Sequence, residues 1–355
     1  MRDQQWRDVA DQAARLEATA DFSGVLRATR GDEVLYESFH GMANRADGIP
    51  VSRSTRFATA SLGKMFTAVG VLDAAGRGEV DLQDAVVDVL PPDRRPTTLL
   101  PGVTVHHLLS HTSGIADYFE EDEDLPGFRE NYDEIWDRLA NYSVRDYAAL
   151  LPLFADLPPV CPPGTAYHYS NAGYVLLGLL LQEVSGTPFP EAVTTRVFAP
   201  AGMTASGYFA FDEVYPDIAQ GYLPPLHPGG PWRTNIYSVH PVGGGDGGAV
   251  VSAPDVERFL RAVHRGGVWR GVTPELVLTR RAGEEGQRWA VGYGVDIRED
   301  GVFGKDGGDP GVATISRCQP GTDTTAVLLA NVDWDTVDGI GDLANALIDA
   351  AMPEA

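Results

Sequence analysis

The sequence predicts a mixed α/β (α+β) protein in which an antiparallel sheet flanked by helices is interrupted by a mainly helical domain. Strand-like runs separated by turn residues occur near the N-terminus and again after residue 290. Between residues 81 and 205 the pattern is helix and loop, with no convincing strand. We therefore expect a sheet-plus-helix domain at residues 1–80 and 235–355, with an inserted helical domain at residues 81–234.

The N-terminal elements follow from simple periodicities. Apolar residues recur at helical spacing between residues 6 and 16, which predicts an amphipathic helix that packs on the rest of the protein. Residues 22–29 and 33–40 are strand-like, and Gly31 and Asp32 between them suit a hairpin turn. A sheet covered by a helix is therefore expected at this end of the chain.

The middle of the chain is predicted from caps and breakers. A Ser-x-x-Asp pattern beginning at Ser143 predicts a capped helix that runs to Leu151. Residues 172–185 are apolar on nearly all sides, so they should form a buried helix ending at Gly186. The glycine-rich residues 243–248 lack the Gly-Lys-Ser/Thr ending of a phosphate loop, which favours close backbone packing.

The C-terminal part returns to strand patterns and ends in a helix. The expected strands and helix are 292–297, 302–305, 313–318, 325–331 and, for the closing helix, 339–351.

Composition limits the kinds of partner. The chain has 355 residues, 43% of them hydrophobic, and a formal net charge of -23, which disfavours nucleic acid and anionic membranes as partners. Its two cysteines and its clustered histidines, His106, His107 and His111, have no neighbouring ligands at metal-binding spacing, so we expect neither a metal nor a cofactor. The N-terminal residues do not resemble an export signal, which predicts a cytoplasmic protein unless a leader has been removed.

The strongest chemical signal is a serine three residues before a lysine. Ser61 and Lys64 stand at the start of an apolar helical run, and positions three apart share one face of a helix. Lys64 could therefore act as a base beside the Ser61 hydroxyl, although a helix-capping serine is the simpler alternative. Free backbone N–H groups at a helix start would also favour a developing oxyanion there.

Lysine usage favours the chemical interpretation. Of the 27 lysines and arginines, only Lys64 and Lys305 are lysines, which leaves 25 arginines. Arginine does not lose its proton in proteins, whereas a desolvated lysine amine can do so and act as a base. We therefore expect both lysines to have chemical roles.

Three motifs and their order carry a family resemblance. The motifs are Ser61-x-x-Lys64, Tyr169-x-Asn171 and Lys305-Asp306-Gly307. Together they resemble the active-site motifs of serine β-lactamases and penicillin-binding proteins. The tyrosine form resembles the branch that contains class C β-lactamases, D-alanyl-D-alanine carboxypeptidases, D-aminopeptidases and β-lactamase-like carboxylesterases. The resemblance extends over roughly residues 20–335 and implies a β-lactamase-like fold.

The resemblance implies a role for each catalytic residue. Ser61 would be the nucleophile, Lys64 would help to take its proton, and Tyr169 would pass a proton to the leaving group. A phenol is ordinarily neutral at pH 7, so flanking ammonium groups would be needed to stabilise its phenolate.

The resemblance also implies roles in binding. Asn171 would orient Lys64 and the substrate, and Lys305 would help to hold it. Backbone N–H groups of Ser61 and Gly308 would form the oxyanion hole, and Gly307 and Gly308 suit a strand edge along which substrate lies closely.

One departure from the family pattern bears on the substrate. Asp306 occupies the position where the family commonly has a hydroxyl residue that helps to bind a carboxylate. If Asp306 lines the cleft, its charge disfavours penicillins and D-Ala-D-Ala and favours neutral or amine-bearing substrates. The alternative is that Asp306 lies on the other face of its strand, against solvent or an arginine. The acidic residues 120–124 would act in the same sense if they bordered the cleft.

The expected function is therefore serine hydrolysis of a small-molecule ester, amide or short peptide through an acyl-enzyme on Ser61. The alternatives are a β-lactamase or D-Ala-D-Ala carboxypeptidase, an acyltransferase and, from another class, an inactive penicillin-binding-like sensor module. An intact set of Ser61, Lys64, Tyr169 and Lys305 argues against the inactive module.

Overall fold

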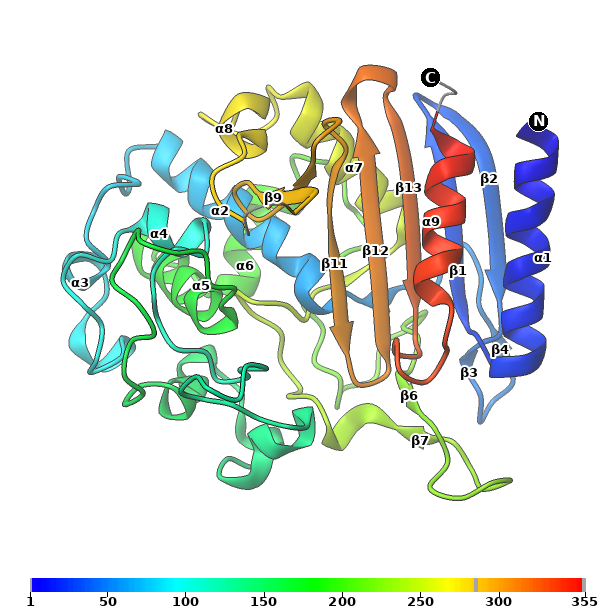
Figure 1. The fold of residues 1–355 in the computed structure, drawn as a ribbon, viewed down its shortest axis with the longest axis horizontal. Coiled ribbons are helices and arrows are strands. Elements are labelled where there is room, and N and C mark those ends of the chain that lie inside the picture. Colours follow the sequence, from blue (N-terminus) through cyan, green and yellow to red (C-terminus); the bar gives the residue numbers. More distant parts are fainter. Residues whose placement is uncertain (1, 284–286, 353–355) are drawn as a thin grey trace.

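The computed structural model describes residues 2–283 and 287–352 and has a seven-stranded sheet at its centre (Figure 1). The strands of this sheet are β1 (Gly24–Arg30), β2 (Glu33–His40), β9 (Trp289–Val291), β10 (Asp296–Arg298), β11 (Phe303–Asp309), β12 (Val312–Gln319) and β13 (Thr324–Ala330). They lie in the order β2-β1-β13-β12-β11-β10-β9, and every neighbouring pair is antiparallel. The predicted antiparallel sheet is confirmed.

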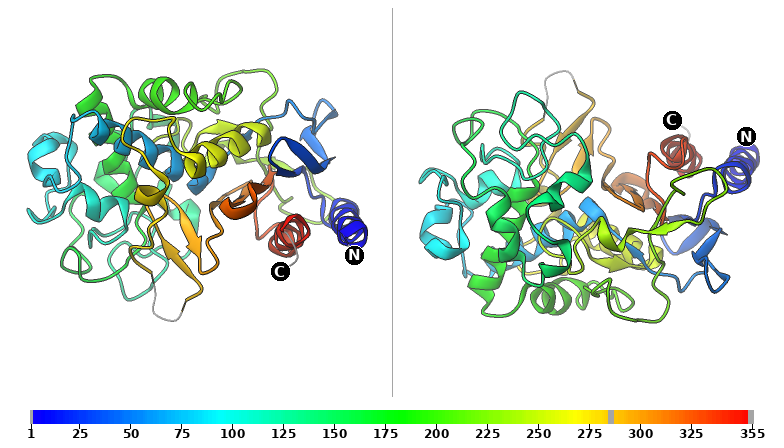
Figure 2. Two further views of the ribbon diagram at one scale, coloured as in Figure 1. Left: turned by 90° about the horizontal axis from the view of Figure 1, so that it is seen from above. Right: turned by 90° about the horizontal axis from the view of Figure 1, so that it is seen from below.

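Helices lie on both faces of the sheet. They also form most of the region next to it, which is called the helical part below. They are α1 (Arg2–Ala20), α2 (Lys64–Gly76), α3 (Val86–Val89), α4 (Val105–Leu109), α5 (Asn171–Ser185), α6 (Phe189–Val193), α7 (Ala253–Arg265), α8 (Pro274–Leu278) and α9 (Ile340–Ala351). Short two-stranded pairings are made by β3 (Met42–Asn44) with β4 (Ile49–Pro50), β5 (Phe57–Ala58) with β8 (Val250–Val251), and β6 (Tyr222–Leu223) with β7 (Arg233–Thr234). Figure 2 shows α1 and α9 side by side on one face of the sheet and α7 on the other.

Two apolar cores hold these layers together. The smaller core joins α1 and α9 to one face of the sheet and includes Val9, Ala13 and Leu343. The larger core lies on the other face, continues into the helical part and includes Phe66 of α2. Because the predicted amphipathic helix buries its apolar side in the smaller core, that prediction is confirmed.

Strands from near the two ends of the chain pair with each other inside the sheet. β1 pairs along its length with β13, from Gly24 opposite Ala330 to Arg30 opposite Thr324. β1 also forms the predicted hairpin with β2, whose turn contains Gly31 at φ +53°. As expected, the structure has no strand between residues 81 and 205, all of which it describes. The division into two domains stays a prediction.

The buried helix predicted before Gly186 is α5. Ser170 caps its start by accepting a hydrogen bond from Gly173 N at 3.0 Å. Gly186 ends it in the left-handed conformation at φ +67°, where glycine carries no steric penalty.

The helix predicted from Ser143 is wrong in its start and in its type. The structure has a 3₁₀ helix at Tyr147–Leu153, and the capping side chain is Asp146, which accepts from Ala148 N at 2.9 Å. Pro152 lies inside this helix, and a proline cannot supply the N–H that a longer α-helix needs there.

The strand predicted at residues 292–297 is also wrong. A turn separates β9 from β10, closed by a bond of 2.8 Å from Gly292 N to Val295 O. Gly294 has φ +75°, and a Cβ there would lie 2.5 Å from the Ala68 side chain and 2.9 Å from Lys64 O. The apolar pattern is therefore explained by packing of this turn on α2.

The glycine-rich residues 243–248 pack closely against other backbone, as predicted. A Cβ on Gly245 would lie 2.0 Å from Tyr174 O in α5. A Cβ on Gly247 would lie 2.7 Å from Ala60 O, directly before Ser61. The segment therefore fits between α5 and the turn that carries the serine.

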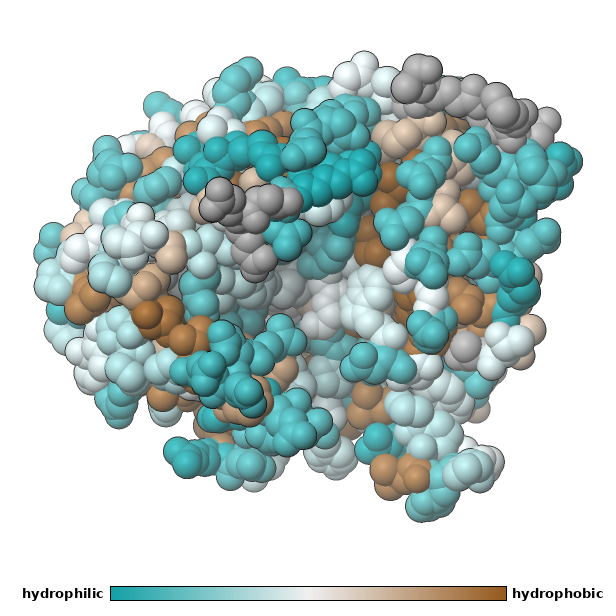
Figure 3. Space-filling view, in the orientation of Figure 1, coloured by the Kyte–Doolittle hydropathy of each residue, from teal (hydrophilic) through white to brown (hydrophobic). Residues whose placement is uncertain are grey.

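The surface drawn in Figure 3 is mostly hydrophilic and is hollowed between the sheet and the helical part. Within the described residues, none of the helices combines the length and the apolar character that crossing a membrane requires.

Gly245→Ala tests this close packing. The added methyl group would overlap backbone that cannot move aside, so we expect the free energy of unfolding to fall by about 1–3 kcal/mol. Gly341→Ala in α9 is the matched control, because a Cβ there meets nothing within 4 Å and alanine favours a helix by up to about 1 kcal/mol. Urea unfolding of both variants measures the difference, and equal stabilities would contradict the packing argument.

Candidate active site

Ser61 lies in a 3₁₀ turn, Ala60–Gly63, that leads from β5 into α2. Thr59 anchors this turn at its start, because its N–H donates to Ala249 O at 2.9 Å and its carbonyl accepts from Thr314 Oγ1 at 2.9 Å. Ala60 has φ +46°, a left-handed conformation that is costly for a residue with a Cβ. The turn is thus fixed from both sides in a strained conformation beside the serine.

Lys64 is fully buried and its ammonium group has three acceptors. Lys64 Nζ donates to Ser61 Oγ at 2.9 Å, to Asn171 Oδ1 at 2.7 Å and to the backbone carbonyl of Asp246 at 2.8 Å. These acceptors come from the serine turn, from α5 and from the glycine-rich segment. The three contacts fix the nitrogen of Lys64 beside the serine hydroxyl.

Tyr169 contacts the serine from the other side. Its hydroxyl donates to Ser61 Oγ at 3.0 Å, and the Nζ atoms of Lys64 and Lys305 each lie 5.1 Å from the centre of its ring. The buried His111 ring stacks on the Tyr169 ring with centroids 4.6 Å apart, and His111 Nδ1 accepts from Ser170 N at 3.1 Å. The position of Tyr169 is therefore set by the bond of its neighbour Ser170 to His111 and by the stacked His111 ring.

The third motif lies on β11. A Cβ on Gly307 would lie 2.3 Å from Thr59 O and 2.9 Å from Leu62 N, so the strand touches the backbone of the serine turn. A Cβ on Gly308 would lie 2.8 Å from the Trp334 ring. Glycine at position 307 therefore lets β11 approach the serine turn, and glycine at position 308 leaves room for the Trp334 ring, while the expected contact of these glycines with substrate stays a prediction.

The two charged residues of the third motif are both paired. Lys305 Nζ donates to Asp296 Oδ1 at 3.0 Å and to Oδ2 at 3.1 Å, and only 7% of Lys305 is exposed. Asp306 forms an ion pair with Arg317 of β12. Asp306 thus has the arginine partner that the alternative allowed, but it does not lie away from the cleft, because it also borders a space beside Ser61.

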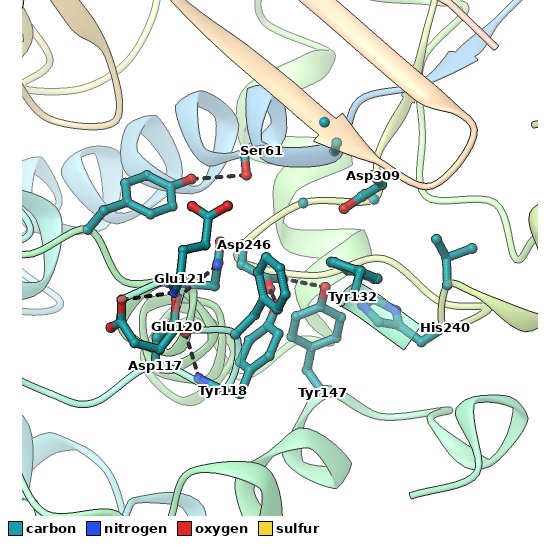
Figure 4. Close-up of a pocket in the computed structure, with 18 of the residues that line it drawn as sticks. Ser61, Asp117, Tyr118, Glu120, Glu121, Tyr132, Tyr147, His240, Asp246 and Asp309 are labelled. Carbon is teal, nitrogen blue, oxygen red and sulfur yellow. Dashed lines mark hydrogen bonds between the residues drawn. The ribbon is translucent and has the colours of Figure 1, made fainter. Parts of the chain in front are cut away.

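A pocket of about 360 Å³ opens beside Ser61 (Figure 4). Its acidic lining residues are Asp117, Glu120, Glu121, Asp246 and Asp309, and its described lining contains no lysine or arginine. The aromatic residues that line it are Tyr118, Phe119, Tyr132, Tyr147, Tyr167, Tyr169 and Phe211. Glu120 and Glu121 place the start of the acidic run 120–124 at this pocket.

The carboxylates of the pocket differ in their partners. Asp117 accepts from Asn171 N and Nδ2, both at 2.9 Å, and Asp246 accepts from the hydroxyls of Tyr118 and Tyr147. Glu121 is exposed, and Figure 4 shows its carboxylate directed toward Ser61. Glu121 is therefore well placed to meet a bound molecule.

Burial raises the pKa of two of these carboxyl groups. The pKa of Asp117 rises to about 6, although backbone N–H groups and Lys64 oppose the effect. The pKa of Asp309 rises to about 7 because of its burial and the nearby charge of Asp246, against the lowering effects of Lys64 and a hydrogen bond from Tyr132. Asp309 therefore changes its charge near neutral pH.

A second, more open hollow of about 430 Å³ meets the pocket at Ser61. It is lined by Ser61, Tyr169, Asp306, Gly307, Gly308 and Trp334. Ser61, Tyr169 and Gly308 line both spaces. A scissile bond at Ser61 could therefore have one side in the deep pocket and the other in the open hollow.

The motif residues and their surroundings were not equally visible in the sequence. The structure brings Ser61, Lys64, Tyr169 and Asn171 together, and Lys305 lies beside Tyr169 but lines neither space. Sequence reasoning missed Asp117, Asp246 and Asp296. Only Asp246 had a local signal, because it interrupts a run of glycines that must pack closely.

The fold and the serine turn define a class of protein, the serine hydrolases of the β-lactamase type, and comparison with known proteins agrees. Penicillin-binding protein 4* of Bacillus subtilis (strain 168) is 28% identical over 332 residues, which are 89% of this chain and 69% of that protein. Esterase EstB of Burkholderia gladioli is 31% identical over 336 residues, which are 82% of each chain. The crystal structure of a penicillin binding protein from Bacillus halodurans has a TM-score of 0.82 and 34% identity, and the match covers 96% of this chain and 99% of that one.

The sequence profile described as Beta-lactamase matches residues 10–351. The chain belongs to this family, and it is a serine hydrolase. The family resemblance stated from the three motifs is thereby confirmed.

Tyr169→Phe tests the contact between the phenol and the serine. The hydroxyl of Tyr169 contacts Ser61 rather than the core, so we expect normal folding with a loss of about a hundredfold or more in the rate of hydrolysis of p-nitrophenyl acetate. Tyr142→Phe, at a tyrosine that is 69% exposed, is the control. A near-normal rate in Tyr169→Phe with an unchanged melting temperature would exclude Tyr169 from proton transfer.

Proposed function

We propose that the protein cleaves an ester or amide bond through an acyl-enzyme on Ser61. The observation that carries this proposal is the position of Ser61 Oγ, which has Lys64 Nζ at 2.9 Å on one side and the Tyr169 hydroxyl at 3.0 Å on the other. A nucleophile needs a base to take its proton and an acid to supply one to the leaving group. Lys64 and Tyr169 are within hydrogen-bond distance for these two tasks.

In the proposed reaction Ser61 Oγ attacks the carbonyl carbon while its proton passes to the neutral amine form of Lys64. Lys64 then returns this proton to Tyr169 once that phenol has protonated the leaving group. The carbonyl oxygen becomes an oxyanion. The backbone N–H groups of Ser61 and Gly308 stabilise it, because they are donors that are already in place before the reaction. Tyr169 donates a proton to the departing oxygen or nitrogen, so that the bond to the leaving group breaks. Water then attacks the ester on Ser61 with the same groups, which releases the acid and restores the serine.

The charges of the pocket favour a neutral or amine-bearing acyl group. Five acidic residues and no lysine or arginine are among the described residues of its lining. A substrate carboxylate would meet like charge there, whereas an ammonium group would gain attraction from Glu121 and from ionised Asp309. Aromatic walls add a favourable surface for an organic cation. Simple esters and D-aminoacyl esters or amides are therefore the proposed substrates.

The alternatives predict different substrates. A β-lactamase or D-Ala-D-Ala carboxypeptidase would turn over nitrocefin or a carboxylate-bearing peptide faster than a neutral ester. An acyltransferase would form the same acyl-enzyme and pass it to an added alcohol or amine faster than to water. An inactive sensor would bind without turnover, which the contacts of Ser61 with both Lys64 and Tyr169 argue against.

Ser61→Ala and Lys64→Arg test the nucleophile and its base. We expect Ser61→Ala to abolish labelling by a fluorophosphonate probe together with hydrolysis of p-nitrophenyl esters. Lys64→Arg should lose nearly as much, because a guanidinium does not accept a proton and Lys64 is fully buried. Labelling of Ser61→Ala at the normal rate would overturn the proposal, and a near-normal rate in Lys64→Arg would show that charge alone suffices.

The preference for a cationic acyl group should depend on pH through Asp309. Below a pKa of about 7 this carboxyl group is neutral, and above it the group is an anion that attracts a cation. We expect kcat/KM for p-nitrophenyl 4-(trimethylammonio)butanoate, relative to its uncharged analogue p-nitrophenyl 5,5-dimethylhexanoate, to rise about fivefold from pH 5 to pH 9. The quaternary ammonium does not titrate, so the enzyme alone supplies the change.

Two variants separate the contributions to this preference. Asp309→Asn should remove the part of the rise that lies near pH 7 and leave only the part near pH 6 that Asp117 can supply, whereas Glu121→Gln should lower the preference and leave the rise in place. A preference that does not change with pH, or that rises in Asp309→Asn as much as in the unmodified enzyme, would contradict the role of Asp309.

A further inference from the structure

Lys305 is held away from the spaces where substrate can bind. The three residues after it, Asp306, Gly307 and Gly308, line the open hollow, but Lys305 lines neither the hollow nor the deep pocket. Its ammonium group instead contacts both carboxylate oxygens of Asp296, at 3.0 and 3.1 Å. The side chain is thus drawn toward β10 by a two-point ion pair.

The pair also removes the net charge of Lys305. Burial by itself would lower the pKa of this lysine, yet the attraction and hydrogen bonds of Asp296, with smaller contributions from Tyr169 and Tyr167, outweigh it and raise the pKa, so the ammonium form persists. An anion that approached this ammonium would have to share it with Asp296 and be repelled by that carboxylate. Lys305 therefore offers little attraction to a substrate carboxylate.

The next charge along β11 is balanced in the same way. Asp306 borders the open hollow, and it is paired with Arg317. Neither Lys305 nor Arg317 consequently presents an unmatched positive charge beside the hollow. Both charged side chains of the third motif are therefore already paired with opposite charges.

We infer that Asp296 is a specificity-determining residue that excludes carboxylate-bearing leaving groups by pairing with Lys305. This inference rests on the proposed function and assigns the open hollow to the leaving group, while the deep pocket takes the acyl group. Removal of the Asp296 charge frees Lys305 to attract an anion in the hollow. Asp296 acts through Lys305 and does not touch the substrate itself.

The test uses two substrates that share an acetyl group and differ only in the leaving group. One is the acetyl ester of 4-hydroxybenzoate, which carries a carboxylate, and the other is the acetyl ester of methyl 4-hydroxybenzoate, which is neutral. In Asp296→Asn we expect the ratio of kcat/KM for the charged ester to that for the neutral ester to rise about fivefold over the unmodified enzyme. The gain should appear mainly in KM and should shrink in high salt.

Asp300→Asn is the matched control. Asp300 pairs with Arg298 on the same hairpin, lines neither space, and its substitution changes the net charge of the protein by the same amount. The ratio should stay unchanged in this variant. Asp296→Glu keeps the carboxylate and should keep the ratio of the unmodified enzyme, and Asp296→Ser replaces Asp296→Asn if thermal unfolding shows that the latter is unstable.

Fluorophosphonate labelling of Ser61 separates the two ways in which the inference can fail. If the unmodified enzyme is neither labelled nor active on the neutral ester, the proposed function fails and the inference falls with it. If labelling persists but the ratio does not rise in Asp296→Asn, or rises equally in Asp300→Asn, only the role of Asp296 is overturned.

Discussion

The structure of the site depends on the burial of one lysine side chain. Lys64 is completely enclosed, and a charge removed from water is tolerated only when it has partners. Its three acceptors belong to the serine turn, to α5 and to the glycine-rich segment, which are far apart in the sequence. The same bonds that satisfy the charge therefore hold the sheet, the helical part and the loop between them in register around Ser61.

The glycine-rich segment makes this arrangement sterically feasible. The carbonyl of Asp246 reaches Lys64 because Gly245 and Gly247 on either side press against the backbone of Tyr174 and Ala60. The side chain of Asp246 points the opposite way and accepts hydrogen bonds from two tyrosine hydroxyls in the pocket wall. One residue thus supports the base through its main chain and shapes the acidic pocket through its side chain.

The sequence was sufficient to predict those structural features that neighbouring residues determine. The hairpin at Gly31, the end of α5 at Gly186 and the motif residues around Ser61 could all be predicted, because turn geometry, capping and nucleophile chemistry are written in neighbouring residues. The turn at Gly294 and the pairing of Lys305 with Asp296 could not, since both depend on which distant segment packs against them. The acidic run could be recognised in the sequence. Its position beside the pocket, with the Glu121 carboxylate directed toward Ser61, could be found only from the fold.

The pairing of β1 with β13 also limits when the central sheet can form during synthesis of the chain. Gly24 lies opposite Ala330, so β1 gains its inner neighbour only after nearly all of the chain has been synthesised. Until then the β1–β2 hairpin is a two-stranded ribbon, which is marginally stable in water and exposes an unpaired edge. Contacts of such long sequence separation slow folding and lengthen the exposure of that edge. The nascent chain, more than the finished enzyme, is therefore the state most exposed to aggregation.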